Sequence, residues 1–198
     1  CIYDGCQVDL DTGLKIEQRQ FARLATSAAT KNMIRALFYD LNESNRLADR
    51  PKDVPKRAFT KVGVLGAGMM GAGLAHVAAN AGLQVVLLDV SQEAADRGKA
   101  YGAKILDAQV LKGRLDPAKR DATLSLVTAT TDYGALAGCE VVVEAVFENR
   151  AVKAEVTRKA EAVLGDDTIF ASNTSTLPIA GLAEVSSRPA NFVGMHFF

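Results

Sequence analysis

The spacing of apolar positions changes near residue 60 and divides the chain into two parts. From residue 11 to residue 47 apolar side chains recur every three to four positions, with a break near Thr26–Thr30, which predicts two helices. Residues 48–60 contain two prolines and several basic residues, and we interpret them as a linker. From Lys61 onward short apolar runs alternate with helical patterns, which is typical of a parallel sheet with crossover helices.

The second part has enough alternating elements for a complete doubly wound α/β sheet. A long helical arm follows the second strand, because the stretch from Ser91 to about Gly113 is helical and Asp116-Pro117 opens another helix. Further helices are expected up to Ala81 after the first strand, over Asn149–Leu164 and over Pro178–Ala183. The predicted strands are Lys61–Leu65, Gln84–Leu88, Ser125–Thr130, Glu140–Ala145, Asp167–Ala171 and Asn191–Phe198. The expected fold is a Rossmann-type, mainly parallel sheet.

A glycine motif follows the first predicted strand and opens the next helix. In Gly66-Ala-Gly68-Met-Met-Gly71 the first glycine permits a tight turn, and Gly68 lets a pyrophosphate approach the backbone. Gly71 lets the helix pack close to the strand, so that the amides of its first turn face the phosphates. A glycine triplet alone is a weak signal, but here the required strand precedes it and the required helix follows. The motif predicts a dinucleotide site.

Asp89 follows the second strand, at the distance from the glycines that the dinucleotide fingerprint requires. A carboxylate there can accept both hydroxyls of the adenosine ribose and would repel the 2′-phosphate of NADP. No arginine follows directly to compensate, so NAD is the expected cofactor. A helix-capping role for Asp89 is the alternative.

Polar residues also close three later strands. His196 lies at the end of the last predicted strand, where a near-neutral side chain could take a proton from an alcohol, although by position alone a structural role fits equally well. The end of the fourth predicted strand contains Glu144 and leads to Glu148, and small polar residues from Ser172 to Thr176 follow the fifth. Loop and capping chemistry alone could explain both groups. His76, on the helix after the glycine loop, is expected to be structural.

The composition adds little to these expectations and is compatible with all of them. Twenty-three basic residues balance twenty-three acidic ones, so charge gives no support to binding of nucleic acid or anionic membranes. No apolar run approaches 18 residues, and three cysteines form neither a metal spacing nor an even disulfide set. We therefore expect no membrane insertion, no metal site and a cytoplasmic location. The first residue is a cysteine and the last lies in an apolar run, so we expect a segment of a longer polypeptide.

Taken together, these motifs resemble the L-3-hydroxyacyl-CoA dehydrogenases of fatty-acid β-oxidation. The resemblance spans Lys61–Phe198 and rests on the glycine motif, Val143-Glu144-Ala145-Val146-Phe147-Glu148-Asn149, Ser172-Asn173-Thr174-Ser175 and His196-Phe-Phe198. Residues 1–60 resemble the junction that joins an enoyl-CoA hydratase/isomerase domain to the dehydrogenase in bacterial multifunctional subunits. The resemblance implies an acyl-CoA substrate, such a hydratase domain in the parent protein and association of the parent with a thiolase.

The resemblance also implies roles for particular residues. His196 would be the base, and Ser175 would touch both the nicotinamide and the substrate hydroxyl. Lys112, on the helical arm, would meet the CoA phosphates. The implied cofactor-binding residues are Gly66, Gly68, Met69, Met70, Gly71, Asp89, Ala145, Val146, Glu148, Lys153, Asn173 and Ser175.

Two departures limit what the 198 residues are expected to do. The family's glutamate that orients the histidine, and its helical domain that closes over the acyl chain, would both lie beyond Phe198. We expect the chain to bind NAD with little turnover. The alternatives are a β-hydroxyacid dehydrogenase, which shares the glycine loop but not the later motifs, and a binding or structural protein that kept the fold and lost the reaction. The presence of His196 and Ser175 argues against the second.

Overall fold

The computed structural model describes residues 1–197, which form two compact units, residues 1–56 and residues 57–197. The first unit is helical, and none of the side chains in its helices is buried. Its elements are α1 (Ile2–Gly5), α2 (Leu10–Ala25), α3 (Ala28–Ile34), a π-helical segment (Arg35–Asp40) and α4 (Leu41–Asn45). The short helix α1 was not predicted from the sequence.

Side-chain caps set the helix boundaries of the first unit. The Asp9 carboxylate accepts a hydrogen bond of 3.0 Å from the Thr12 amide at the start of α2. Ser27 accepts one of 3.2 Å from the Thr30 amide at the start of α3. Each cap satisfies an amide that has no partner inside the helix. The predicted break between two helices therefore falls at Thr26–Ser27, where one helix ends and a capping serine starts the next.

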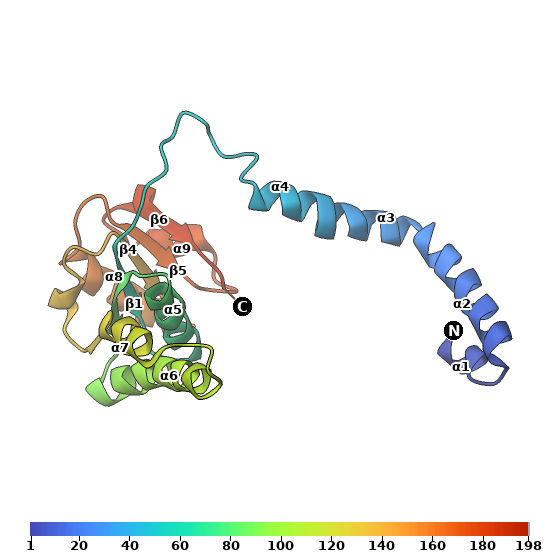
Figure 1. Ribbon diagram of the computed structural model, residues 1–198. Coiled ribbons are helices and arrows are strands. Elements are labelled where there is room, and N and C mark those ends of the chain that lie inside the picture. Colours follow the sequence, from blue (N-terminus) through green and yellow to red (C-terminus); the bar gives the residue numbers. More distant parts are fainter. Residues whose placement is uncertain (198) are drawn as a thin grey trace. The chain divides into compact units, whose positions relative to one another are not determined.

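The second unit is a six-stranded parallel sheet in the order β3-β2-β1-β4-β5-β6. Helices connect its strands (Figure 1). The strands are β1 (Lys61–Leu65), β2 (Gln84–Leu88), β3 (Val127–Thr130), β4 (Val141–Glu144), β5 (Ile169–Ser172) and β6 (Phe192–Gly194). The α-helices are α5 (Met69–Asn80), α6 (Gln92–Leu111), α7 (Pro117–Ser125), α8 (Arg150–Glu161) and α9 (Ile179–Ala183), with 3-10 turns at Tyr133–Leu136 and Pro189–Asn191. The predicted doubly wound α/β fold is confirmed.

Alternation along the strands divides the core between the two faces of the sheet. Val62 and Val64 of β1 pack in one cluster with Ala75 and Ala79 of α5. Leu65 belongs to the other cluster, together with Ala160 of α8. Because successive side chains of a strand point to opposite faces, both faces of this sheet need apolar residues, and helices cover both.

The observed strand β6 is shorter than the strand predicted from the sequence. The prediction ran from Asn191 to Phe198, but β6 pairs with β5 only from Phe192 to Gly194, because β5 itself ends at Ser172. The chain then leaves the sheet, so His196 lies in a loop rather than in a strand. Phe198 falls outside the described residues. Smaller differences concern the starts of β3, β4 and β5, each one or two residues later than predicted.

Candidate functional site

The glycine motif forms a turn that only glycine fits at two positions. Gly66 has a φ of +95°, and a Cβ added there would lie 2.7 Å from the Ala145 carbonyl oxygen. A Cβ at Gly71 would lie 1.7 Å from the carbonyl oxygen of Gly66, which is far inside van der Waals contact. The backbone of α5 therefore packs directly on the turn after β1. These contacts agree with the structural roles predicted for the two glycines.

Gly68 differs from its neighbours because space is open around it. A Cβ there would meet nothing within 4 Å, and Gly68 is the N-cap residue of α5, which no side chain caps in the described structure. The amides of the first helical turn thus face an open region. A helix start with unsatisfied amides and a positive dipole end is suited to bind a phosphate group.

Asp89 is fixed at the end of β2 beside this turn. Its carboxylate accepts hydrogen bonds from the Ala67 amide at 2.6 Å and from the Val90 amide at 2.7 Å. Ser91, not Asp89, caps the following helix α6, so the capping alternative is excluded. Each oxygen of a carboxylate can accept a second hydrogen bond. Asp89 is therefore held in place and can still accept ligand hydroxyls.

A cleft of about 410 Å³ lies at the carboxyl ends of the first four strands. Gly66 after β1, Asp89 after β2 and Val146 after β4 all line it. Its remaining lining includes Leu65, Leu88, Val90, Thr131, Tyr133, Val156 and Lys159. The cleft contains the point where the strand order reverses, between β1 and β4, and open α/β sheets bind ligands at this point.

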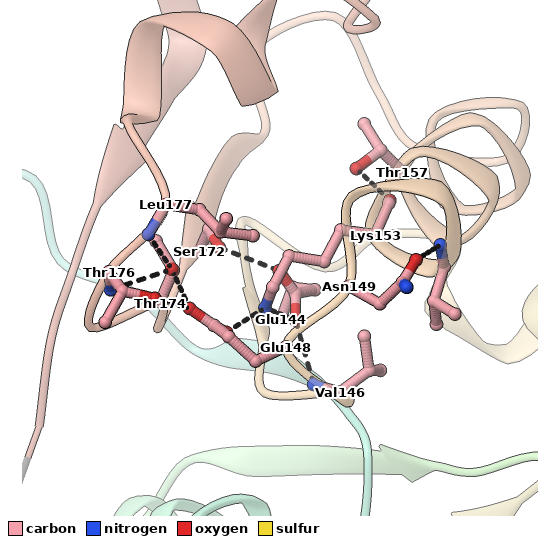
Figure 2. A network of polar contacts seen from close by, with 11 residues as sticks. Glu144, Val146, Glu148, Asn149, Lys153, Thr157, Ser172, Thr174, Thr176 and Leu177 are labelled. Carbon is pink, nitrogen blue, oxygen red and sulfur yellow. Dashed lines mark hydrogen bonds and ion pairs between the residues drawn. The ribbon is translucent and has the colours of Figure 1, made fainter.

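A buried ion pair lies at the ends of β4 and β5 (Figure 2). The Lys153 ammonium lies 2.8 Å and 3.0 Å from the two carboxylate oxygens of Glu144, and both side chains are at most 3% exposed. Glu144 also accepts hydrogen bonds from the Val146 amide at 2.8 Å and from the Ser172 hydroxyl at 2.7 Å. The carboxylate is thus fully hydrogen-bonded, as a buried charge requires.

Glu148 continues this network toward the surface. One oxygen lies 3.1 Å from the Lys153 ammonium, and the other accepts hydrogen bonds from the hydroxyls of Thr174 and Thr176. Partial burial opposes its ionisation, but the hydrogen bonds from Thr174 and Lys153 and the charge of Lys153 outweigh this and lower the pKa of Glu148 to about 2. Glu148 is therefore a fixed negative charge at neutral pH.

Backbone and side-chain contacts join the loops after β5 and β6. The Met195 amide donates to the Ser172 carbonyl at 3.0 Å, and the Phe197 amide donates to the Asn173 side-chain oxygen at 2.7 Å. The Asn173 amide in turn donates to the Glu144 carbonyl at 2.8 Å. Asn173 therefore ties the segment that carries His196 to the end of β4.

The family model described as "3-hydroxyacyl-CoA dehydrogenase, NAD binding domain" matches residues 61–198. The chain belongs to this family. The match begins at the first residue of β1 and includes the whole sheet. The β-hydroxyacid dehydrogenase alternative is thereby set aside.

Relatives of this dehydrogenase domain include longer proteins. A fatty acid oxidation complex subunit alpha from Psychrobacter cryohalolentis is 40% identical over 95% of the chain, and one from Shewanella sp. (strain W3-18-1) is 35% identical over all of it. The chain spans only 26% and 28% of these two proteins.

Solved structures of the same family share the fold. (S)-3-Hydroxybutyryl-CoA dehydrogenase from Ralstonia eutropha is 38% identical, with a TM-score of 0.68 over 71% of this chain and 50% of its own. 3-Hydroxybutyryl-CoA dehydrogenase from Escherichia coli K12 is 35% identical, with a TM-score of 0.69 over 72% of this chain and 30% of its own.

The site residues predicted for the dehydrogenase do not all lie in one place. Lys112 lies at the end of α6 and lines a different groove, of about 460 Å³, with Tyr101, Lys104, Ile105, Ala108, Gln109 and Arg114. Met69, Ser175 and His196 are exposed, and Met70 and Ala145 are half-buried. The remaining predicted residues lie in the glycine turn, beside the cleft or in the ion-pair network.

Sequence reasoning missed two parts of the site. Glu144 was noted only as a polar strand end, although an acidic residue that closes a buried apolar strand signals a specific partner. Tyr133 and Lys159, whose ammonium lies 6.0 Å from the centre of the Tyr133 ring, gave no local signal because they come from separate elements. His76, in contrast, is half-buried against Gly102 of α6, as its predicted structural role requires. Across residues 1–197 no helix is long and apolar enough to cross a membrane.

Proposed function

We propose that NAD lies along the carboxyl edge of the sheet, with its pyrophosphate on the turn from Gly66 to Gly71. The observation that carries the proposal is the open space at Gly68 above the uncapped start of α5. Asp89, at the end of β2, would hold the adenosine ribose in the adjoining cleft. The nicotinamide would then extend in the opposite direction, over the ends of β4 and β5, where Glu148 and Lys153 lie.

The other predicted cofactor contacts follow from this placement. Met69 and Met70 start the helix that would face the pyrophosphate. Ala145 and Val146 form the turn after β4, directly beside Gly66. Asn173 fixes the loop that carries Ser175 at the nicotinamide end.

For the parent protein we propose oxidation of an L-3-hydroxyacyl-CoA to the 3-ketoacyl-CoA. His196 would accept the hydroxyl proton, and Ser175 would hydrogen-bond the same hydroxyl and keep it oriented. The nicotinamide supplies the hydride acceptor when NAD is bound. Lys112, with Lys104 and Arg114 in the same groove, would hold the CoA phosphates.

The 198 residues alone are proposed to bind NAD with little turnover. We propose that residues 1–60 join this domain to an enoyl-CoA hydratase domain in a cytoplasmic parent that associates with a thiolase. The longer relatives are named as subunits of a fatty acid oxidation complex, which supports a longer parent protein that works within a complex.

Titration with NADH, followed by the enhancement of its fluorescence, tests cofactor binding directly. NADPH is the control, because Asp89 would repel its 2′-phosphate. We expect NADH to bind at least about tenfold more tightly, which corresponds to about 1.4 kcal/mol. Absence of NADH binding would refute the proposal, and equal affinities would refute the role of Asp89.

A further inference from the structure

The ion-pair network at the ends of β4 and β5 holds one more negative charge than positive charge. Glu144 and Lys153 compensate each other, since they are buried together and bonded through both carboxylate oxygens. Figure 2 shows the Lys153 ammonium between the two glutamates, with Glu148 on the side of the threonine hydroxyls. After the buried pair is counted, the charge of Glu148 remains.

Nothing else described next to Glu148 cancels this charge completely. Thr174 and Thr176 donate neutral hydroxyl hydrogen bonds to it. The helix α8 begins two residues further along the chain, at Arg150, after the N-cap Asn149. A helix start contributes about half a positive charge, which is less than the unit charge of a carboxylate.

We propose that Glu148 sets the redox preference of the cofactor site, by favouring the positively charged nicotinamide of NAD⁺ over the neutral ring of NADH. This inference rests on the proposed function, which places the nicotinamide at this end of the sheet. Hydride transfer from the substrate carbon brings two electrons and one proton to the ring and removes its positive charge, while the hydroxyl proton goes to the base. A fixed negative charge nearby therefore stabilises the oxidised cofactor more than the reduced one.

The consequence is a site that takes up the oxidised cofactor and releases the reduced one more readily than an uncharged site would. The buried Glu144–Lys153 pair supports this function because it fixes the position of the segment that carries Glu148. It holds the turn from residue 145 to residue 149 through the Val146 amide, and it holds β5 through Ser172. Glu148 is thereby kept at a fixed place rather than on a mobile loop.

A purely structural role for Glu148 makes a different prediction. If the carboxylate only holds the loop of Thr174 and Thr176 in place, its loss should weaken the binding of both forms of the cofactor equally. If its charge acts on the ring, its loss should weaken the binding of NAD⁺ more than the binding of NADH. The ratio of the two dissociation constants therefore separates the two roles.

The experiment measures Kd for NAD⁺ by calorimetry and for NADH by fluorescence, with the 198-residue chain at low salt. For Glu148→Gln we expect the ratio of Kd for NAD⁺ to Kd for NADH to rise about 3- to 10-fold. Added salt should reduce this effect. The matched control is Glu155→Gln, which removes an exposed carboxylate from α8, the helix that follows Glu148, where it pairs only with Lys159 in the described structure. Its ratio should stay within about twofold of the unmodified chain.

Glu148→Asp keeps the charge and shortens the side chain. Its ratio should match the unmodified chain even if both affinities fall. An unchanged ratio in Glu148→Gln, or the same change in Glu148→Asp, would overturn the inference. If the unmodified chain binds neither NAD⁺ nor NADH, the proposed function itself fails, and that result is distinct from an unchanged ratio.

Discussion

Replacement of Lys153 by methionine tests the energetics of the ion-pair network. Methionine keeps most of the apolar stem of lysine but removes the ammonium, which lies within 3.0 Å of both Glu144 oxygens. Glu144 would keep its hydrogen bonds from the Val146 amide and the Ser172 hydroxyl, but its charge would be buried and uncompensated. Loss of one partner of a buried pair costs about 3–5 kcal/mol. Since whole domains are stable by about 5–15 kcal/mol, we expect a large fraction of the stability to be lost.

Urea unfolding followed by circular dichroism measures the effect. The matched control is Lys159→Met on the same helix, because Lys159 pairs with Glu155 at 2.6 Å while both side chains are more than half exposed. Exposed pairs contribute about 0–1 kcal/mol, so the control should change little. The double variant Glu144→Gln, Lys153→Met should recover much of the lost stability, because neither charge is then left unpaired.

Two results would refute this reasoning. If Lys153→Met costs no more than Lys159→Met, the Glu144 carboxylate is solvated when its partner is absent, and the pair is not energetically buried. If the double variant is no more stable than Lys153→Met alone, the two side chains are not coupled.

Three further predictions follow from the structure. Gly71→Ala should unfold the turn or abolish NADH binding, because its Cβ would lie 1.7 Å from a carbonyl oxygen, whereas Gly68→Ala should keep the melting temperature and weaken only NADH binding. Burial raises the pKa of the Cys139 thiol to about 11, so at pH 8 only the two exposed cysteines should react with a disulfide reagent until the protein is denatured. The pKa of Glu148 is lowered to about 2, so its ionised form stabilises the fold above the unfolded value of about 4.3. Glu148→Gln should therefore be less stable than the unmodified chain at pH 6, and the difference in unfolding free energy should disappear as the pH falls toward 2.

Elements with local signals at both ends could be predicted from the sequence. The strands Lys61–Leu65 and Gln84–Leu88 were predicted with the observed bounds, because a glycine or an aspartate follows each apolar run directly. The same reasoning failed for β6, since the apolar run after Asn191 continues beyond the residues that have a partner in β5. The length of an edge strand depends on the strand with which it pairs. The apolar pattern of the edge strand itself carries no information about that neighbour.

The candidate site likewise has one part that could be predicted from the sequence and one that could not. The glycine turn could be predicted because its constraints are local: a positive φ at Gly66 and a close backbone contact at Gly71. The hydrogen-bond donor to Asp89 could not be predicted, because the Ala67 amide lies 22 positions earlier in the chain. That hydrogen bond exists only because β1 and β2 end level with each other, at Leu65 and Leu88.

The level strand ends also explain why a buried acid is compatible with this fold. The register places Leu65 beside Glu144 and Glu144 beside Ser172, so the turns after β1, β4 and β5 all begin at one edge. At this edge the Glu144 carboxylate on β4 can accept a hydrogen bond from the Ser172 hydroxyl on β5. The helix α8, which begins six residues after Glu144, brings Lys153 within 3.0 Å. The sequence alone shows an acidic residue at the end of an apolar strand and a lysine nine positions later. Only the parallel register and the first turn of the following helix bring them together, and the same register sets Glu148 beside the loop that follows β5.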